Sequence, residues 1–423
     1  MPLRRFDVKS WRGSPLSRRT FDLDGLEEQQ AQVRAICDRI RRRGDAALRD
    51  YGRRFDGWAP GPDDGFAVPG AEVAAAVERV TPKQREALEF AARRIRAFHE
   101  MEVIDPDAGR EGLRLLTRPV RRAAIYVPGG RAAYPSTLLM GVIPARIAGV
   151  AEVVVATPPA PDGSVPFAVL AAAAVAGADA VYRVGGAQAI AALAYGTATI
   201  PRVDVIAGPG NVYVMLAKRE VFGSVGIDSL AGPTEIMVVA DAGARPEHVA
   251  ADLASQLEHD PMAWAVLVTD SKDLADRVEQ QLDAPARRLK RGEVIGAAHC
   301  CIVLTQDLEE ALTVANDFAP EHLEIIASDA EALAARVENA GAVFVGPWAP
   351  VPLGDYVAGP NHTLPTMGTA RFSSPLGVYN FVKRHSVASL TRNDLEMLRE
   401  ACVAMADMEG LSAHAHAIEV RVG

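Results

Sequence analysis

A glutamate and a histidine stand side by side at Glu321 and His322, in the stretch NDFAPEHLE. Their unperturbed pKa values lie on either side of about 5, so the two side chains could transfer protons in acid–base catalysis. Pro320 should end the preceding helix, because its ring cannot continue the hydrogen-bond ladder. Residues 323–326 are predicted to form a short buried strand. The pair is therefore expected at a helix-to-strand turn, where the alternative is an ordinary polar surface loop.

Other side chains offer nitrogen and oxygen donors. Gln256 and His259 lie three residues apart near the end of a predicted helix, so they share one face. Asp355 and His362 stand in a long polar loop, and loops of that length are usually functional. His414 lies in a His-Ala-His sequence near the C-terminus. Each alone is more often an ordinary polar residue, but Gln256, His259, Asp355 and His414 together would suit zinc or a similar divalent ion.

Two series of short β-branched runs supply the elements that must position these residues. The runs alternate with Ala-rich helical stretches, and this alternation predicts right-handed βαβ units with parallel sheets. We therefore expect an α/β fold with two doubly wound, Rossmann-like domains, an N-terminal arm and a helical C-terminal tail. The runs are 124–127, 152–156, 180–184 and 203–207 in the first series, and 236–240, 265–268, 301–304, 323–326 and 342–345 in the second.

Glycine-rich turns follow three runs of the first series, at 128–130, 185–186 and 208–210. Ligands of open parallel sheets bind outside the carboxyl ends of the strands, so these turns could bring backbone N–H groups to a phosphate. Glycine also serves tight turns that hold no ligand. Tyr213 stands where a GxGxxG fingerprint needs its third glycine, and there is no Walker A sequence. A nucleotide cleft is possible, but these turns do not single out a nicotinamide.

Composition limits the class of protein. A chain of 423 residues is too long for one compact domain, and its net charge of -9 disfavours a nucleic-acid or anionic-membrane partner. The basic first nineteen residues contain no apolar h-region, which favours a solvated arm over a secretory signal. No apolar run is a credible membrane span. Four cysteines without a CxxC spacing fit a reducing cytoplasm.

Long blocks of the chain resemble the histidinol dehydrogenase family. The resemblance runs from about Phe55 to the C-terminus, with the blocks in the family's order. The blocks are YVPGG at 126–130, GGAQAIAALAYGT at 185–197, GPGN at 208–211, AGPTE at 231–235, SQLEHD at 255–260, PEHLE at 320–324, GDYVAGPNHTLPT at 354–366 and EGLSAH at 409–414.

The resemblance implies oxidation of L-histidinol through L-histidinal to L-histidine, with two NAD and one water. It makes Glu321 and His322 the catalytic pair. It assigns one zinc ion per subunit to Gln256, His259, Asp355 and His414. The substrate would be held by these four together with His322, Thr234 and Glu409, with His362 nearby, and the NAD site would be lined by Tyr126, Gln188 and Asn211.

The resemblance also implies an interlaced homodimer whose active site is shared between chains. The expected domains are an arm at 1–20, a large discontinuous domain at 21–125 and 236–375, a small NAD-side domain at 126–235, and a dimerisation tail at 376–423. Two departures from the family pattern are mild. Thr234 replaces a serine but keeps the hydroxyl, and His416, which many members lack, is not assigned to the metal.

Three alternatives stay open at this point. A paralogue could oxidise another polar alcohol, such as a sulfonated diol. A zinc hydrolase could use Glu321 to activate water, in which case the Gly-rich turns would be structural. A metal-binding protein without catalysis would leave the Glu321–His322 pair idle. Formation of NADH in the presence of histidinol distinguishes a histidinol dehydrogenase from a zinc hydrolase and from a metal-binding protein without catalysis.

Overall fold

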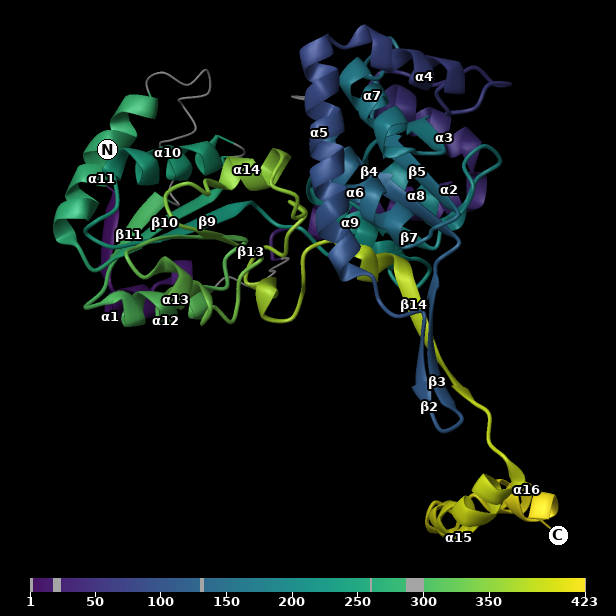
Figure 1. Cartoon of the computed structure of the whole chain (residues 1–423). Coiled ribbons are helices and arrows are strands. Elements are labelled where there is room, and N and C mark those ends of the chain that lie inside the picture. Colours follow the sequence, from purple (N-terminus) through teal and green to yellow (C-terminus); the bar gives the residue numbers. More distant parts are fainter. Residues whose placement is uncertain (1–2, 18–23, 130–132, 259–260, 287–299, 423) are drawn as a thin grey trace. The chain divides into compact units, whose positions relative to one another are not determined.

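The computed structural model describes residues 3–17, 24–129, 133–258, 261–286 and 300–422 (Figure 1). Contacts between Cα atoms divide the chain into two compact units. Residues 1–103 and 120–381 form the first unit, and residues 104–119 and 382–423 form the second. The predicted α/β class with two parallel sheets is confirmed, and both parallel sheets belong to the first unit.

The first sheet has the strand order β6-β5-β4-β7-β8, with all neighbours parallel. Its strands are β-branched or Ala-rich and are buried by helices on both faces, as expected for a parallel sheet. The strands are β4 (Arg122–Tyr126), β5 (Glu152–Thr157), β6 (Ala180–Arg183), β7 (Val205–Ala207) and β8 (Gly226–Ile227).

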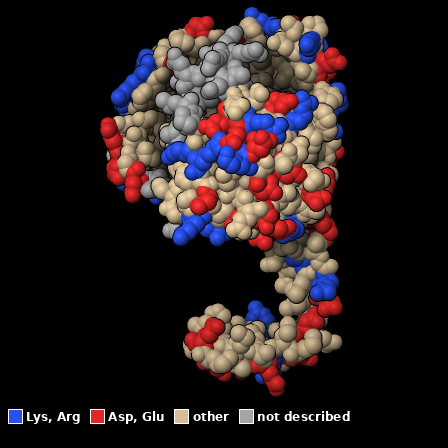
Figure 2. Space-filling view, turned by 90° about the vertical axis from the view of Figure 1, so that its left-hand side faces the viewer, with Lys and Arg blue, Asp and Glu red and all other residues tan. Residues whose placement is uncertain are grey.

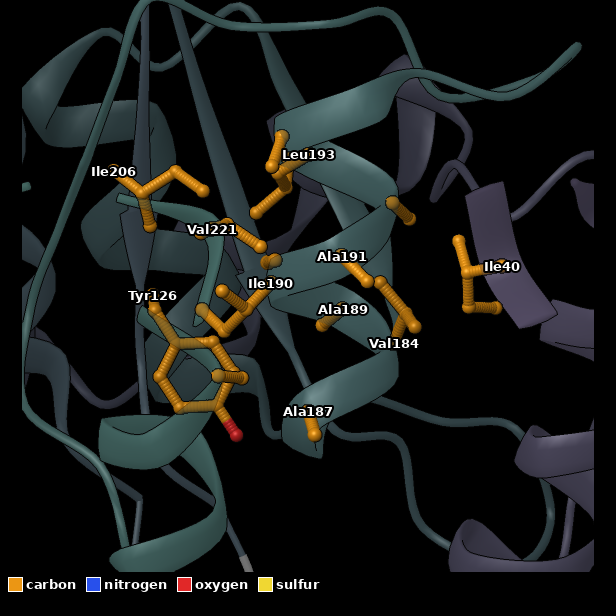
Figure 3. Packing of buried hydrophobic residues seen from close by; sticks show 14 of the residues in the cluster. Ile40, Tyr126, Val184, Ala187, Ala189, Ile190, Ala191, Leu193, Ile206 and Val221 are labelled. Atoms are coloured by element: carbon orange, nitrogen blue, oxygen red, sulfur yellow. The ribbon is translucent and has the colours of Figure 1, made fainter. Parts of the chain in front are cut away.

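Two groups of helices cover the faces of this sheet. One core cluster joins α2, α3, α8 and α9 to it, and a second joins α4, α5, α6 and α7. Figure 3 shows Ile40 of α2 facing α8 within the first cluster. The bounds are α2 (Glu27–Arg43), α3 (Asp45–Tyr51), the π-helical η2 (Gly52–Asp56), α4 (Gly70–Arg79), α5 (Pro82–His99), η3 (Glu100–Glu102), α6 (Pro135–Ile147), α7 (Phe167–Ala176), α8 (Gly186–Tyr195) and α9 (Val212–Val221).

The packing of α2 to α5 differs from the domain division expected from the sequence. That division joined residues 21–125 to the second sheet, whereas the apolar faces of these helices bury against the first. Local signals were nevertheless accurate. Thr81 and Gln84 form a capping box at the start of α5, with Pro82 in the first turn, as the sequence Thr-Pro-Lys-Gln at 81–84 favours. Such signals define where a helix starts, but not the sheet on which it packs.

The second sheet has the order β1-β11-β10-β9-β12-β13 and is also parallel. Side chains alternate between its faces. One face packs on α10, α11 and α14, and the other on α1, α12 and α13. The bounds are β1 (Arg4–Asp7), α1 (Val8–Gly13), η1 (Pro15–Ser17), β9 (Glu235–Ala240), α10 (Pro246–Leu257), β10 (Trp264–Thr269), α11 (Lys272–Ala286), β11 (Cys300–Leu304), α12 (Leu308–Phe318), β12 (His322–Ile326), α13 (Ala330–Ala334), β13 (Ala342–Val345), α14 (Val351–Tyr356), η5 (Thr369–Arg371) and η6 (Val378–Phe381).

The expectation of a solvated N-terminal arm was wrong for residues 4–13. Strand β1 pairs in parallel with β11 at the edge of the second sheet. Asp7 then caps α1, and Trp11 on that helix is only 2% exposed. The Trp11 ring lies 5.8 Å from that of Phe318, the last residue of α12. Arg4 and Arg5, two of the basic residues that suggested an arm, lie on a strand whose partner strand is remote in the sequence.

Replacing Trp11 by alanine should destabilise the protein by about 3–5 kcal/mol, because a large buried aromatic side chain is lost and a cavity remains. Urea unfolding followed by circular dichroism would measure the change. Trp348→Ala is the matched control, since Trp348 is 82% exposed and should change stability by less than about 0.5 kcal/mol. Equal losses in the two variants would contradict the burial of α1.

The second unit contains an antiparallel sheet of order β14-β3-β2 and two helices that pack on each other. Helix α15 starts at a capping box formed by Thr391 and Asp394, close to the predicted start. Both helices carry exposed apolar side chains, among them Met397, Met405 and Met408. The bounds are β2 (Asp107–Arg110), β3 (Leu113–Pro119), β14 (Val382–Ala388), α15 (Arg392–Met408) and α16 (Ser412–Val422).

On the face shown in Figure 2, basic and acidic side chains are interspersed. Among the described residues, no helix is both long enough and apolar enough to cross a membrane. All four cysteines are free thiols, and burial raises the pKa of Cys37, Cys300 and Cys301 to about 12. These three thiols are therefore protonated and unreactive at neutral pH.

Candidate active site

Glu321 and His322 lie at the predicted helix-to-strand turn. Helix α12 ends at Phe318, Ala319 adopts a left-handed φ of 51°, and β12 begins at His322 after Pro320. The pair is not on a surface loop, because Glu321 is 7% exposed and His322 is 4% exposed. Buried ionisable groups need partners, so the surroundings of these two side chains define the site.

A chain of hydrogen bonds holds the Glu321 carboxylate. The Thr234 hydroxyl donates to Glu321 Oε2 at 2.5 Å, and the backbone N–H of Glu235 donates to the same oxygen at 2.8 Å. The Gln256 amide nitrogen donates to the Thr234 hydroxyl. Two donors on one oxygen fix the orientation of the carboxyl group. The structure thus brings Thr234, Gln256 and Glu321 together.

The two ring nitrogens of His322 have different surroundings. Nδ1 lies 3.0 Å from the backbone oxygen of Glu235, which can only accept, so Nδ1 carries the proton of the neutral ring. Nε2 is buried and makes no hydrogen bond to the described residues; Asp355 Oδ1 is 3.8 Å away. The neutral ring consequently has its free lone pair on Nε2, as a general base requires.

Opposing effects act on the pKa of His322. Burial lowers this pKa, but the nearby carboxylates of Glu321 and Asp355 outweigh burial and raise it to about 9. The Glu321 carboxylate contributes most to the increase, and its Oε2 lies 3.4 Å from Nδ1. The His322 ring can thus carry a second proton at neutral pH and lose it at mildly alkaline pH.

A pocket of about 260 Å³ adjoins His322 and is lined also by Asp355, His362 and Glu102. Asp355 lies in the short helix α14, not in the irregular loop expected there. Its backbone oxygen lies 3.0 Å from His362 Nδ1, while His362 Nε2 is 3.0 Å from the Thr137 hydroxyl on α6. Burial lowers the pKa of His362, so its ring is neutral at pH 7. The pocket can accept a small polar molecule next to the free nitrogen of His322.

The donors predicted for zinc are only partly described. Gln256 is buried, and its amide nitrogen bonds Thr234, which leaves the amide oxygen as the metal donor. Asp355 supplies an anionic oxygen. His259 lies outside the described residues, and His414 belongs to α16 of the second unit. No group of three His, Cys, Asp or Glu side chains within the described residues could hold a metal alone, whereas the donors that are present suit a divalent ion in chemistry.

Glu409 and His414 lie close together in sequence in the second unit. Glu409 follows the last residue of α15, and His414 and His416 both lie on α16. Their expected roles toward substrate and metal therefore remain predictions.

The residues expected to bind NAD lie at the carboxyl edge of the first sheet. Strand β5 flanks β4 on one side and β7 flanks it on the other, which makes the β4–β7 gap the switch point where such sheets bind ligands. Tyr126 ends β4, and Asn211 follows β7. The Asn211 side chain accepts hydrogen bonds from the N–H groups of Tyr213 and Val214, at 3.1 Å each, and so caps α9.

Tyr126 and Gln188 meet at the start of α8. The Tyr126 hydroxyl accepts a 3.0 Å hydrogen bond from the N–H of Gly186, and Figure 3 shows this hydroxyl pointing toward that helix end. The Gln188 amide nitrogen lies 3.4 Å from Asp56 Oδ2. Burial raises the pKa of Asp56 to about 6 and that of Tyr126 to about 12. A carboxyl, a phenol and an amide therefore line this edge, and such groups can hydrogen bond to the hydroxyls of a ribose.

Three residues of these sites were missed from sequence. Glu235 holds both catalytic side chains through its backbone N–H and C=O, and backbone contacts leave no residue-type signal. Asp56 belongs to Phe-Asp-Gly at the start of the resemblance, which could have drawn attention to it. Glu324 hydrogen bonds to Asp252, and burial followed by the Asp252 charge raises the pKa of Glu324 to about 9. Glu324 is therefore a neutral acid beneath the site.

Comparisons with known proteins agree with this geometry. A family model described as histidinol dehydrogenase matches residues 20–422. The chain is 49% identical over 411 residues to a histidinol dehydrogenase of Synechococcus sp., covering 95% of this chain and 94% of that protein. It is 47% identical over 424 residues to one of Geobacillus kaustophilus, covering 98% and 99%. The crystal structure of histidinol dehydrogenase from Elizabethkingia anophelis matches with a TM-score of 0.91 and 32% identity, covering 99% of this chain and 98% of that one.

Proposed function

Because the chain belongs to the histidinol dehydrogenase family, we propose that it oxidises L-histidinol to L-histidine through L-histidinal, with two NAD and one water. This activity completes histidine biosynthesis, and we assign it to the cytoplasm. The observation that carries the proposal is the buried pair of Glu321 and His322, with Nε2 of His322 beside a pocket and making no hydrogen bond to the described part of the chain.

Two groups complete the proposed site. When bound, NAD accepts hydride, and zinc holds and orients the nitrogen atoms of the substrate. We assign zinc to Gln256, His259, Asp355 and His414, and NAD to Tyr126, Gln188 and Asn211. We assign substrate binding to Thr234 and Glu409 beside these ligands. The buried amide of Gln256 and the polar groups around Tyr126 support these assignments.

The proton transfers follow from the contacts of the catalytic pair. His322 takes the alcohol proton at Nε2, because its Nδ1 proton is held by the carbonyl of Glu235. In the second oxidation Glu321 takes a proton from water, which adds to the aldehyde carbonyl. Both hydrogen bonds to Glu321 end on Oε2, so we assign the water to Oε1. His322, protonated in the first oxidation, gives that proton to the carbonyl oxygen as the water adds, and then takes it back from the resulting hydroxyl as hydride leaves.

The stoichiometry of the reaction tests this function. We expect two NADH for each histidinol consumed, measured by absorbance together with chromatographic quantification of histidinol and histidine. One NADH per histidinol with released aldehyde would restrict the activity to an alcohol dehydrogenase. No NADH from histidinol would overturn the proposal.

The rate should rise with pH through the neutral range. His322 acts as a base only when neutral, and its pKa is raised to about 9, so kcat/KM should fall about tenfold per pH unit below the break. A cation bound to Asp355 would offset part of the increase that this carboxylate causes in the pKa of His322. The plot of kcat/KM against pH should therefore level off at or below about pH 9. Profiles between pH 6 and 10 would measure it. Zinc content of the same samples distinguishes loss of metal at low pH from protonation of His322, and a flat profile from pH 6 to 8 would contradict the assignment.

We further propose a homodimer in which each active site draws Glu409 and His414 from the partner. The basis is the exposed apolar surface of the second unit, where Met397 is 74% exposed and Met408 is 79% exposed. Exposed apolar side chains on a short two-helix segment favour burial against another protein surface. In a dimer whose two copies exchange this segment, the surface of the partner would bury them.

A further inference from the structure

A buried ion pair lies next to the proposed cofactor edge. Lys218 of α9 contacts Asp228, which follows β8, and each side chain is only 3% exposed. The proton transfers proposed above use neither residue. A buried charge pair of this kind is costly to desolvate, so its contacts indicate what it does.

Both charged groups form hydrogen bonds with the backbone of one residue, Gly208. The Lys218 ammonium donates to the backbone oxygen of Gly208 at 3.1 Å. The backbone N–H of Gly208 donates to Asp228 Oδ2 at 2.8 Å, while the other oxygen of Asp228 binds Lys218. The N–H and C=O of one glycine are thus held by opposite charges that also bind each other.

Gly208 is where the turn after β7 meets the end of β4. Its φ is +114°, a conformation that favours glycine. A Cβ at this position would lie 2.2 Å from the backbone oxygen of Tyr126. Asn211, which begins α9, follows three residues later. Holding Gly208 therefore fixes Tyr126 and Asn211 relative to each other across the switch point.

We propose that Lys218 and Asp228 are positioning residues that set the cofactor turn at 208–211. The inference rests on the proposed function, because it takes the ligand at this edge to be NAD. An apolar pair of similar volume would often stabilise a fold equally well, so stability alone does not account for two buried charges. Charge-assisted hydrogen bonds to both peptide groups of Gly208 give the turn a defined orientation.

The test separates positioning from stability. Lys218→Met leaves the Asp228 charge buried without its partner and should lower the urea midpoint. The double variant Lys218→Met/Asp228→Asn removes both charges and keeps an acceptor for the N–H of Gly208, so its midpoint should return toward wild type. Its dissociation constant for NADH, measured by fluorescence titration, should nevertheless stay about tenfold to a hundredfold higher than wild type, because the charge-assisted hydrogen bonds that orient the turn are lost.

A control variant and a measurement of histidinol affinity test whether the loss of NADH affinity is specific to this turn. Glu220→Gln is the matched control, because Glu220 lies on α9 but pairs with the exposed Arg34 and should leave NADH affinity unchanged. Histidinol affinity without NAD, measured by calorimetry, should be unchanged in the double variant. Recovery of NADH affinity together with stability, or parallel losses of NADH and histidinol affinity, would overturn the positioning role. Absence of NADH binding by the wild type would instead refute the proposed function, on which the inference depends.

Discussion

Replacing Glu321 by glutamine should lower the rate of histidinal oxidation far more than the rate of histidinol oxidation. Only the aldehyde step needs a water to be activated, and this is the role assigned to Glu321. General acid–base catalysis contributes about 100- to 10,000-fold, so the aldehyde step should slow by a factor in that range. Glutamine keeps an oxygen that can accept from Thr234 and the N–H of Glu235, so the site should keep its shape.

The same substitution should also move the pH dependence of the first step. The Glu321 carboxylate contributes most to raising the pKa of His322, so removing its charge lowers that pKa. The alcohol step of Glu321→Gln should consequently reach its plateau at lower pH than in the wild type. His322→Ala, by contrast, removes the base used in both steps and should slow both about equally.

Single-turnover measurements with histidinol and with histidinal, each at saturating NAD, would resolve the two steps. Glu324→Gln is a suitable control, since Glu324 lies three residues after Glu321, on β12, and its raised pKa of about 9 already makes it neutral at pH 7. It should change either rate by less than about tenfold. Equal losses of the two steps in Glu321→Gln would remove the water-activating role.

Mixing two inactive variants should restore about a quarter of wild-type activity if the site is shared between chains. One variant carries His322→Ala and the other carries His414→Ala, and each alone should be nearly inactive. Random pairing makes about half of the dimers mixed. In a mixed dimer with exchanged C-terminal segments, one site has both histidines intact and the other carries both lesions.

The alternative arrangement gives a clearly different result. If residues 382–423 complete the site of their own chain, every site in a mixed dimer carries one lesion, and mixing recovers nothing. The two variants should be unfolded and refolded together, with different affinity tags so that heterodimers can be isolated and counted. Full-length heterodimers without activity would rule out the shared site.

Several features could be predicted because their signals are local. The β-branched runs predicted the strands of both parallel sheets except β1 and β8, since buried strands need such side chains wherever they pack. The Thr81–Gln84 capping box and Pro320 marked helix ends through contacts spanning only a few residues. Glu321 and His322 were placed at a turn for the same reason.

Other features depend on contacts between segments far apart in the sequence. Residues 4–7 form a strand only because β11 offers an edge nearly three hundred residues later. Helices α2 to α5 pack on the first sheet because their apolar faces are complementary in shape to the faces of that sheet. No local sequence pattern encodes this complementarity.

The chemistry of the site divides in the same way. The sequence by itself determined which residue types are available, namely a carboxylate beside an imidazole, a threonine hydroxyl and a set of nitrogen and oxygen donors. The tertiary structure decided which nitrogen of His322 is free, through the backbone oxygen of Glu235, and it raised the pKa of that ring. Backbone contacts and burial depend on residues that only the folded chain brings together, so they cannot be predicted from residue types alone.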